Sequence, residues 1–110
     1  MTYQDFLRLV MDATEFGDIE SYIAETGGSV PATVSDSSLV PLLTRCWEYA
    51  HDRGVKAIRQ MTGLSMAAFS REYRIPLRTL QNWEASGDNA RSCPGYVLDL
   101  MAYAVVSEAE

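Results

Sequence analysis

The feature that most constrains the fold is the recurrence of apolar residues at helical spacing, in short blocks that glycine or proline separates. From residue 39 onwards five such blocks follow one another, at residues 39–52, 55–62, 65–73, 76–85 and 94–106. The first 26 residues contain two more blocks with the same spacing. Because signals for strands are scarce, the sequence predicts an all-α fold.

A chain of 110 residues is long enough for one domain with at most a small appendage. The two blocks before residue 27 predict a helical hairpin, and the stretch after it is rich in Gly, Ser, Thr and Pro, which is typical of a linker. We therefore expect an acidic N-terminal helical hairpin at residues 1–26, a linker at residues 27–38 and a helical domain at residues 39–110.

Several classes of protein are disfavoured by what the sequence lacks. No apolar run approaches the roughly 20 residues of a membrane span, and the start of the chain lacks a signal-peptide pattern, so we expect a complete cytoplasmic protein. Cys46, Cys93 and His51 are too few and too badly spaced for a zinc site, and we expect ordinary thiols. Without a nucleophile triad, a ligand cluster or a phosphate-binding glycine loop, we expect no catalysis and no cofactor.

The net charge of −6 argues against general nucleic-acid binding, but the charges are unevenly distributed. Residues 1–54 contain nine acidic and three basic side chains, whereas residues 55–91 contain six basic and three acidic ones. A locally basic segment on an acidic chain suits a specific DNA surface better than a non-specific one. The alternative is a chance unevenness in a solvated surface.

Residues 65–84 predict two short helices joined by a tight connection. Ser65 is a good N-cap for the first helix, and Pro76 suits the start of the second. The second helix has a polar face and an apolar face. This arrangement is a helix-turn-helix unit.

The stretch IRQMTGLSMAAFSREYRIPLRTLQNWEASG, residues 58–87, resembles the DNA-binding domain of lambda-repressor and Cro-like regulators, the XRE group. The family pattern of Ile-Arg, Gly-Leu-Ser, Phe and Trp-Glu falls in one register here, and the resemblance extends over about residues 55–106. It implies a lambda-repressor-like helix-turn-helix bundle, with the hairpin as an N-terminal extension and a DNA-binding domain at residues 39–110.

The resemblance separates residues that support the recognition helix from those that read DNA. Arg59 and Glu84 match positions that form a structural ion pair in similar proteins. The core that fixes the angle between the two helices is expected to contain Ile58, Leu64, Phe69, Leu80 and Trp83. A polar residue at any of these five positions loses burial worth roughly 1.5–3 kcal/mol.

The same resemblance assigns base reading to four residues of the recognition helix, which are Leu77, Arg78, Gln81 and Asn82. Arginine bonds guanine, asparagine and glutamine bond adenine, and leucine packs against a thymine methyl. Leu77 is also at core spacing, so burial is its alternative. Phosphate contacts are expected from the side chains or helix-end amides of Lys56, Ser65, Met66, Thr79 and Arg91.

Three residues depart from the family pattern. Met66 stands where a phosphate-binding glutamine is common, and Arg74 stands where a glycine usually makes the turn. Arg74 therefore either avoids a positive φ or carries a small strain. Asp88 lies in a loop that is commonly basic in similar proteins, and weaker phosphate binding is expected from this loop.

These features predict a sequence-specific DNA-binding transcriptional regulator, such as an autorepressor or an antitoxin, that binds double-stranded operator DNA as a homodimer. The acidic hairpin could supply a protein-partner surface. The last helix could supply a dimer surface through Tyr96, Val97, Leu100, Met101 and Val105, unless these residues form internal core. The alternative function is a protein-interaction module that has kept the fold and lost operator binding.

Overall fold

The computed structural model describes residues 1–85 and 92–110. In these ranges the chain forms seven α-helices, one 3-10 helix and no strand, which confirms the predicted all-α fold. The elements are α1 (Tyr3–Ala13), α2 (Ile19–Thr26), η1 (Gly27–Ser29), α3 (Asp36–His51), α4 (Val55–Thr62), α5 (Met66–Tyr73), α6 (Leu77–Glu84) and α7 (Gly95–Ser107). None of these helices combines the length and apolar character that a bilayer-spanning helix requires.

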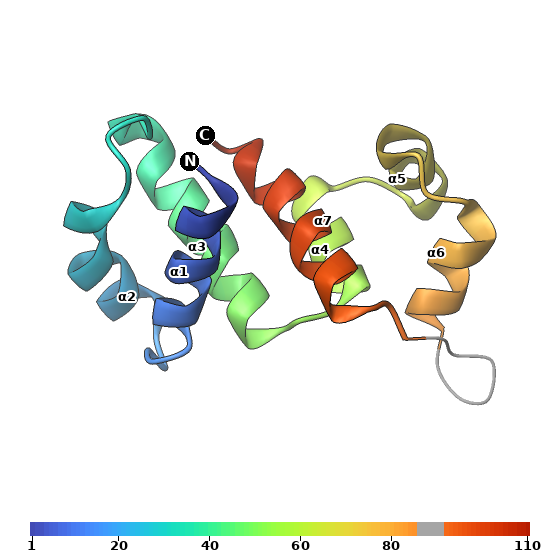
Figure 1. Cartoon of the computed structure of the whole chain (residues 1–110), viewed down its shortest axis with the longest axis horizontal. Coiled ribbons are helices and arrows are strands. Elements are labelled where there is room, and N and C mark those ends of the chain that lie inside the picture. The colour runs from blue at the N-terminus through green and yellow to red at the C-terminus, as the bar shows by residue number, and fades with distance from the viewer. Residues whose placement is uncertain (86–91) are drawn as a thin grey trace.

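The molecule is elongated, with extents of 43 × 26 × 22 Å. Helices α1, α2 and α3 lie at one end, α5 and α6 lie at the other, and α4 and α7 lie between them (Figure 1). The two termini are neighbours (Figure 1), because the amino group of Met1 forms an ion pair with the Glu110 carboxylate. The Tyr103 hydroxyl on α7 also donates to the Met1 carbonyl at 2.8 Å. Helices α5 and α6 occupy the end of the molecule away from α1 and α2 (Figure 1).

The first two helices begin at side-chain caps that the sequence encodes. Thr2 Oγ1 accepts from the Asp5 amide at 3.1 Å, and the Asp5 carboxylate accepts from the Thr2 amide at 3.0 Å. At the start of α2, the Asp18 carboxylate accepts from the Ser21 amide at 2.9 Å. These hydrogen bonds stabilise the ionised carboxylates and lower the pKa of both Asp5 and Asp18 below the ordinary value.

Helix α3 begins three residues earlier than its apolar pattern indicates, at Asp36 instead of Leu39. Ser35 precedes the helix in extended conformation, and the Asp36 carboxylate lies in the first turn, where negative charge is favourable. Pro41 consequently lies inside the helix and removes one backbone hydrogen bond on its exposed side. The expected division at residues 26 and 38 stays a prediction.

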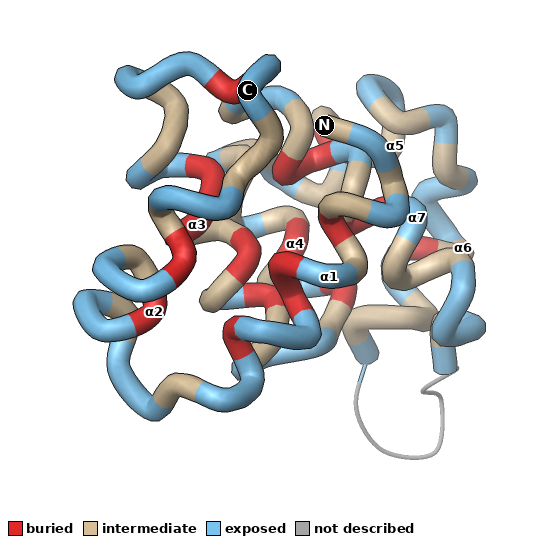
Figure 2. Tube along the Cα trace, turned by 60° about the vertical axis from the view of Figure 1, so that its left-hand side comes forward, coloured by how far each residue is buried: buried red, intermediate tan, exposed pale blue. Residues whose placement is uncertain are grey.

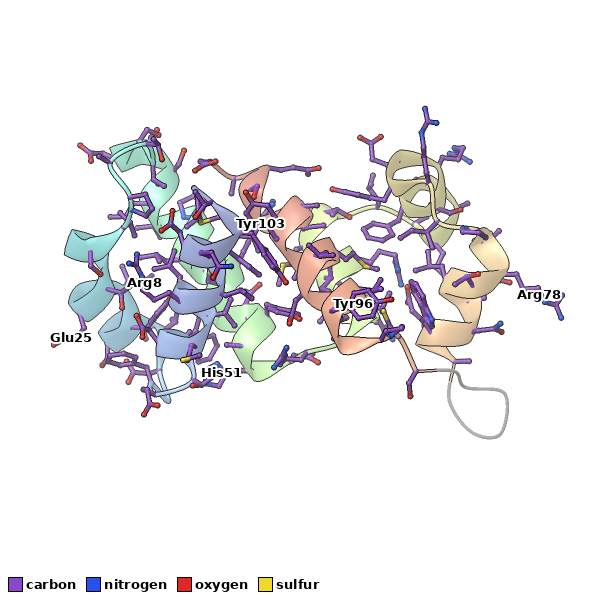
Figure 3. The ribbon with its side chains drawn as sticks, in the orientation of Figure 1. Arg8, Glu25, His51, Arg78, Tyr96 and Tyr103 are labelled. Carbon is purple, nitrogen blue, oxygen red and sulfur yellow. The ribbon has the colours of Figure 1, made fainter. Side chains whose placement is uncertain are left out.

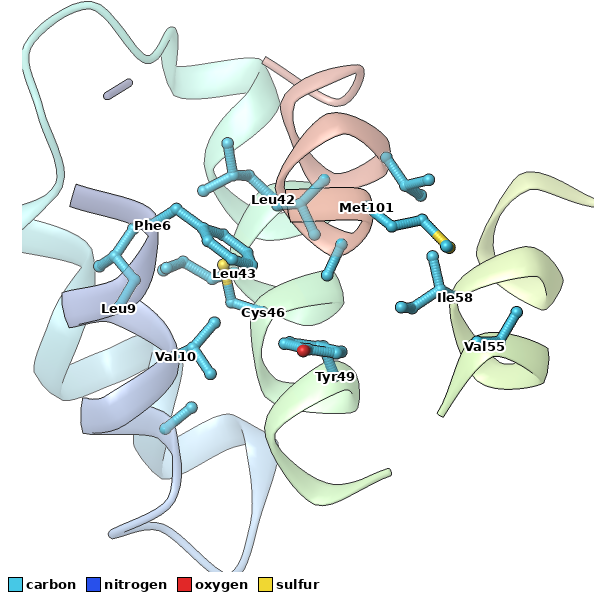
Figure 4. Packing of buried hydrophobic residues seen from close by; sticks show 14 of the residues in the cluster. Phe6, Leu9, Val10, Leu42, Leu43, Cys46, Tyr49, Val55, Ile58 and Met101 are labelled. Atoms are coloured by element: carbon cyan, nitrogen blue, oxygen red, sulfur yellow. The ribbon is translucent and has the colours of Figure 1, made fainter. Parts of the chain in front are cut away.

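One cluster of buried side chains runs through most of the length of the molecule (Figures 2 and 4). The long helices α3 and α7 contribute to it from the middle, and α1 covers them on one side. The completely buried large side chains are Tyr22, Tyr49, Phe6, Phe69, Leu9, Leu42, Leu43, Ile58, Leu80, Val105, Val106 and Cys46. Burial raises the pKa of the Cys46 thiol to about 12, which suits a packing role.

Polar contacts fix α3 against α7. The Tyr49 hydroxyl donates to Asp99 Oδ1 at 2.5 Å, and Arg53 Nη2 donates to the same oxygen at 2.6 Å. Arg45 donates to the carbonyls of Val105 at 2.8 Å and Met61 at 3.4 Å, so its charge lies near the carboxyl ends of both α7 and α4. These contacts fix α7 and α4 in place relative to α3.

Candidate nucleic-acid interface

Helices α5 and α6 have the short lengths and tight connection of a helix-turn-helix unit. Ser65 caps α5, since its Oγ accepts from the Ala68 amide at 3.2 Å. Helix α6 follows α5 after only three residues, and Pro76 precedes its first residue, Leu77. Proline supplies a fixed φ here and lacks an amide that would need a partner.

The turn between α5 and α6 depends on Arg74 and Ser70. Arg74 adopts the left-handed conformation, with φ 55° and ψ 43°. The Ile75 amide then donates to the Ser70 carbonyl at 3.1 Å, and the Ser70 hydroxyl donates to the Ile75 carbonyl at 2.5 Å. The backbone bond is the one that closes a Schellman motif, in which a left-handed residue ends the helix. Of the two alternatives for Arg74, the structure therefore has the positive φ.

The apolar residues expected beneath the recognition helix lie on the inner side of α4, α5 and α6. Ile58, Phe69 and Leu80 are completely buried, whereas Leu64 and Trp83 are half-buried and pack against the same cluster. A buried leucine in an eight-residue helix is a strong constraint, because so short a helix is marginal in isolation. Helix α6 is therefore held by packing from α4 and α5.

An ion pair holds the C-terminal end of α6. Arg59 Nε donates to Glu84 Oε2 at 2.8 Å, and Arg59 Nη2 donates to Glu84 Oε1 at 2.8 Å. The third nitrogen, Nη1, donates to the Leu64 carbonyl at 3.0 Å. The side chains of Arg59 and Glu84 are only 16% and 3% exposed. The hydrogen bonds to Glu84 raise the pKa of Arg59, so the guanidinium keeps its charge.

The four residues expected to read bases lie on α6. Leu77 is 39% exposed, so it does not belong to the core. Arg78 and Gln81 are exposed and Asn82 is half-buried. Figure 3 shows Arg78 extending away from the body at the end of the molecule opposite Arg8. Among the residues that the structure describes, no ion pair or hydrogen bond joins the side chains of Arg78, Gln81 or Asn82 to a partner.

The residues expected to contact phosphate are divided among three elements. Lys56 is exposed on α4, Ser65 and Met66 lie at the start of α5, and Thr79 is half-buried on α6. The Ser65 hydroxyl already accepts from the Ala68 amide, so it would meet a phosphate through its remaining donor. The assignments of Arg91 and Asp88 lie outside the described residues.

Helix α7 has one buried side and one exposed side. Met101 and Val105 belong to the core, whereas Tyr96 is 71% and Leu100 49% exposed. An apolar groove of about 290 Å³ borders the exposed side, lined by Tyr73, Ile75, Trp83, Val97, Leu100, Met101 and Ala104. The two expectations for this helix, internal core and partner surface, thus apply to different faces of it.

A second hollow, of about 390 Å³, lies between α3 and α4, and α6 does not line it. Its lining includes His51, whose ring stacks on Trp47 with centroids 4.2 Å apart and whose Nδ1 lies 2.9 Å from the Trp47 carbonyl. The lining contains carboxylates but no hydroxyl or thiol nucleophile. Over the described ranges no group of three His, Cys, Asp or Glu side chains is placed to hold a metal ion.

Two features of this surface were not assigned from the sequence. Ser70 locks the turn through its hydroxyl, and Arg71 at the end of α5 and Arg74 in the turn are both exposed. The basic character of residues 55–91 contained a signal for both arginines. Comparisons of the chain with protein-family models, curated proteins and solved structures found no match.

Proposed function

We propose that this chain is a cytoplasmic, sequence-specific DNA-binding transcriptional regulator that inserts α6 into the major groove of its operator. The observation that carries the proposal is the division of α6 into two faces. Leu80 and Glu84 hold the helix from the inner side, while Arg78 and Gln81 are exposed on the outer side. A short helix held in this way is already ordered before it binds, so little conformational entropy is lost when its polar side chains contact DNA.

The chemistry of the outer face suits base recognition. The guanidinium of Arg78 can donate two parallel hydrogen bonds to guanine, and the amides of Gln81 and Asn82 can bond both donor and acceptor of adenine. Leu77, exposed at the first residue of α6, supplies an apolar surface for a thymine methyl. The four side chains together would read a half-site of a few base pairs.

This reading surface is small and would contact only one half-site. A homodimer would therefore bind a palindromic operator whose two half-sites lie about 34 Å apart. The exposed side of α7 is the candidate dimer surface, since Leu100 lines the apolar groove and the exposed Tyr96 lies four residues earlier on the same face of the helix. Exposed apolar patches of this kind mark protein contacts.

The experiment that tests the proposal is the selection of bound duplexes from a random library, followed by binding measurements on the selected site. Arg78→Ala and Asn82→Ala should each lower the preference for one base pair by roughly 1–3 kcal/mol and leave the melting temperature unchanged. Arg8→Ala removes the same charge at the opposite end and should change neither quantity. Leu80→Ala should destabilise the fold by about 2–5 kcal/mol.

If no sequence is enriched over random duplex at low salt, the regulator proposal is overturned. The groove beside α7 favours a second candidate function, a protein-interaction module. Sedimentation of the chain without DNA, with Leu100→Glu as the surface variant, separates the two functions. Self-association that Leu100→Glu abolishes, without any enriched duplex, supports the second.

A further inference from the structure

Arg74 is the one non-glycine residue with a positive φ in the described part of the chain. The left-handed conformation brings the Cβ of an L-residue close to the backbone, and glycine adopts it without this penalty. Arginine at this position is thus an unfavourable choice for the backbone alone.

The turn itself requires the left-handed conformation, whatever the side chain. Only with this φ does the Ile75 amide reach the Ser70 carbonyl, at 3.1 Å, and close the helix end. The Arg74 side chain is exposed and is not needed for these backbone contacts. A residue that strains the fold at an exposed turn points to a function outside the fold.

The position of Arg74 suggests that function. Arg71 lies one turn earlier on α5, Arg78 lies in the first turn of α6, and all three arginines are exposed. Within residues 1–85 and 92–110 none of the three forms an ion pair, although Arg8, Arg53 and Arg59 each do. The charge at this edge is therefore not neutralised by the described acidic residues.

We propose that Arg71 and Arg74 form a phosphate-binding edge that grips the DNA backbone beside the groove that α6 enters. The ligand is the phosphodiester, whose two non-bridging oxygens match the paired donors of a guanidinium. The inference rests on the proposed function and deepens it, because it adds phosphate contacts at the C-terminal end of α5, whereas Met66 at the first residue of α5 has no polar side chain to supply one. The resemblance to the XRE group assigned neither arginine to DNA.

The decisive variant is Arg74→Gly, because the proposal predicts opposite changes in folding and in binding. Glycine relieves the strained backbone, so the melting temperature should rise by about 2–6 °C. Loss of the guanidinium should weaken binding to a fluorescent 30-base-pair selected duplex about tenfold at 50 mM salt. The slope of log affinity against log salt concentration should fall by about 1.

Two further variants at residue 74 separate charge from backbone geometry. Arg74→Gln keeps the strained backbone, removes the charge and should weaken binding without raising the melting temperature. Arg74→Lys keeps the charge and should keep the wild-type salt dependence. Arg71→Gln should lower the slope by a similar amount, whereas Arg8→Gln, at the far end, should leave it unchanged.

Binding of the selected duplex by wild type and Arg74→Gly with equal affinity and equal salt slope would overturn the phosphate-binding edge and leave the proposed function standing. A wild-type chain that binds no duplex in the same titration overturns both proposals. Weaker binding of Arg74→Gly with an unchanged salt slope also overturns the edge, because it shows that no phosphate contact was lost.

Discussion

Arg59 and Glu84 show at the scale of single residues how a charge can serve as a structural part. The pair is almost enclosed, and every nitrogen of the guanidinium has an acceptor within 3.0 Å. An enclosed pair need not stabilise more than an apolar pair of the same size, but removing one partner leaves the other charge without compensation. Its value to this fold is that it ties the end of α6 to α4.

We predict that Arg59→Ala will lower the free energy of unfolding by about 3–5 kcal/mol, because it leaves the Glu84 carboxylate buried without its partner. Arg53→Ala is the matched control, since Arg53 also pairs with a carboxylate but its side chain is 53% exposed. The control should cost about 1 kcal/mol or less. Urea denaturation of the three proteins measures both values, and equal losses would contradict the structural role of the Arg59 pair.

The sequence alone was informative for the core residues beneath α6. The resemblance to the XRE group placed Ile58, Phe69 and Leu80, one each on α4, α5 and α6, in the core, and each is completely buried. Leu77 fitted both a core and a surface position, because the sequence of one helix does not show how much of its surface a neighbouring helix covers. The φ of Arg74 was equally open, since it depends on whether the Ser70–Ile75 contacts close the turn.

At the scale of helices, the short elements are stabilised at their ends as well as by burial. The caps of α1 and α2 use the carboxylates of Asp5 and Asp18, and hydrogen bonds lower the pKa of both groups. A carboxyl whose pKa is lower in the folded state binds its proton more weakly there than in the unfolded chain. Its stabilisation is present above the unfolded pKa, about 4, and is lost as the pH falls through the native pKa.

We therefore predict that the double variant Asp5→Asn and Asp18→Asn will lose less stability than wild type between about pH 5 and pH 2. Asparagine keeps a capping oxygen but has no carboxyl to titrate. Asp12→Asn, exposed within α1, removes a carboxylate that caps no helix and serves as the control. Urea midpoints at several pH values test this, and an unchanged acid profile in the double variant would refute it.

The start of α3 shows a limit of pattern reading at this scale. The apolar repeat begins at Leu39, but helix formation begins at Asp36, where polar residues supply the first turn. The spacing of apolar residues indicates the buried part of a helix, but it does not indicate a first turn that consists of polar residues. A helix that began at Leu39 would have Pro41 in its first turn, whereas the structure has Pro41 inside the helix.

At the scale of the whole molecule, the N-terminal helices and the rest of the chain share buried surface. Phe6 on α1 lies against Tyr49 on α3 and Tyr103 on α7, with ring centroids 6.1 and 5.6 Å apart. The sequence predicted both N-terminal helices but not this packing, because an apolar stripe does not identify its partner. Shared burial of this kind favours unfolding in one step.

We predict that the chain will unfold cooperatively, with both ends losing structure together. Trp47 reports on the hairpin end, where its Nε1 donates to the Phe16 carbonyl at 3.1 Å, and Trp83 reports on α6. In Trp47→Phe and in Trp83→Phe, fluorescence of the remaining tryptophan should follow the same urea transition as helical circular dichroism. An earlier fluorescence transition for Trp47 would show instead that residues 1–26 unfold as a separate unit.

The elongated shape has an electrostatic consequence. In physiological salt the influence of an exposed charge decays over about 8 Å, whereas the long axis of the molecule is 43 Å and has the hairpin and α6 at its opposite ends. A polyanion at the α6 end would therefore be screened from most of the acidic side chains that make the total charge −6. Lowering the salt concentration extends that range, so the repulsion from the far end would be felt most in dilute buffer.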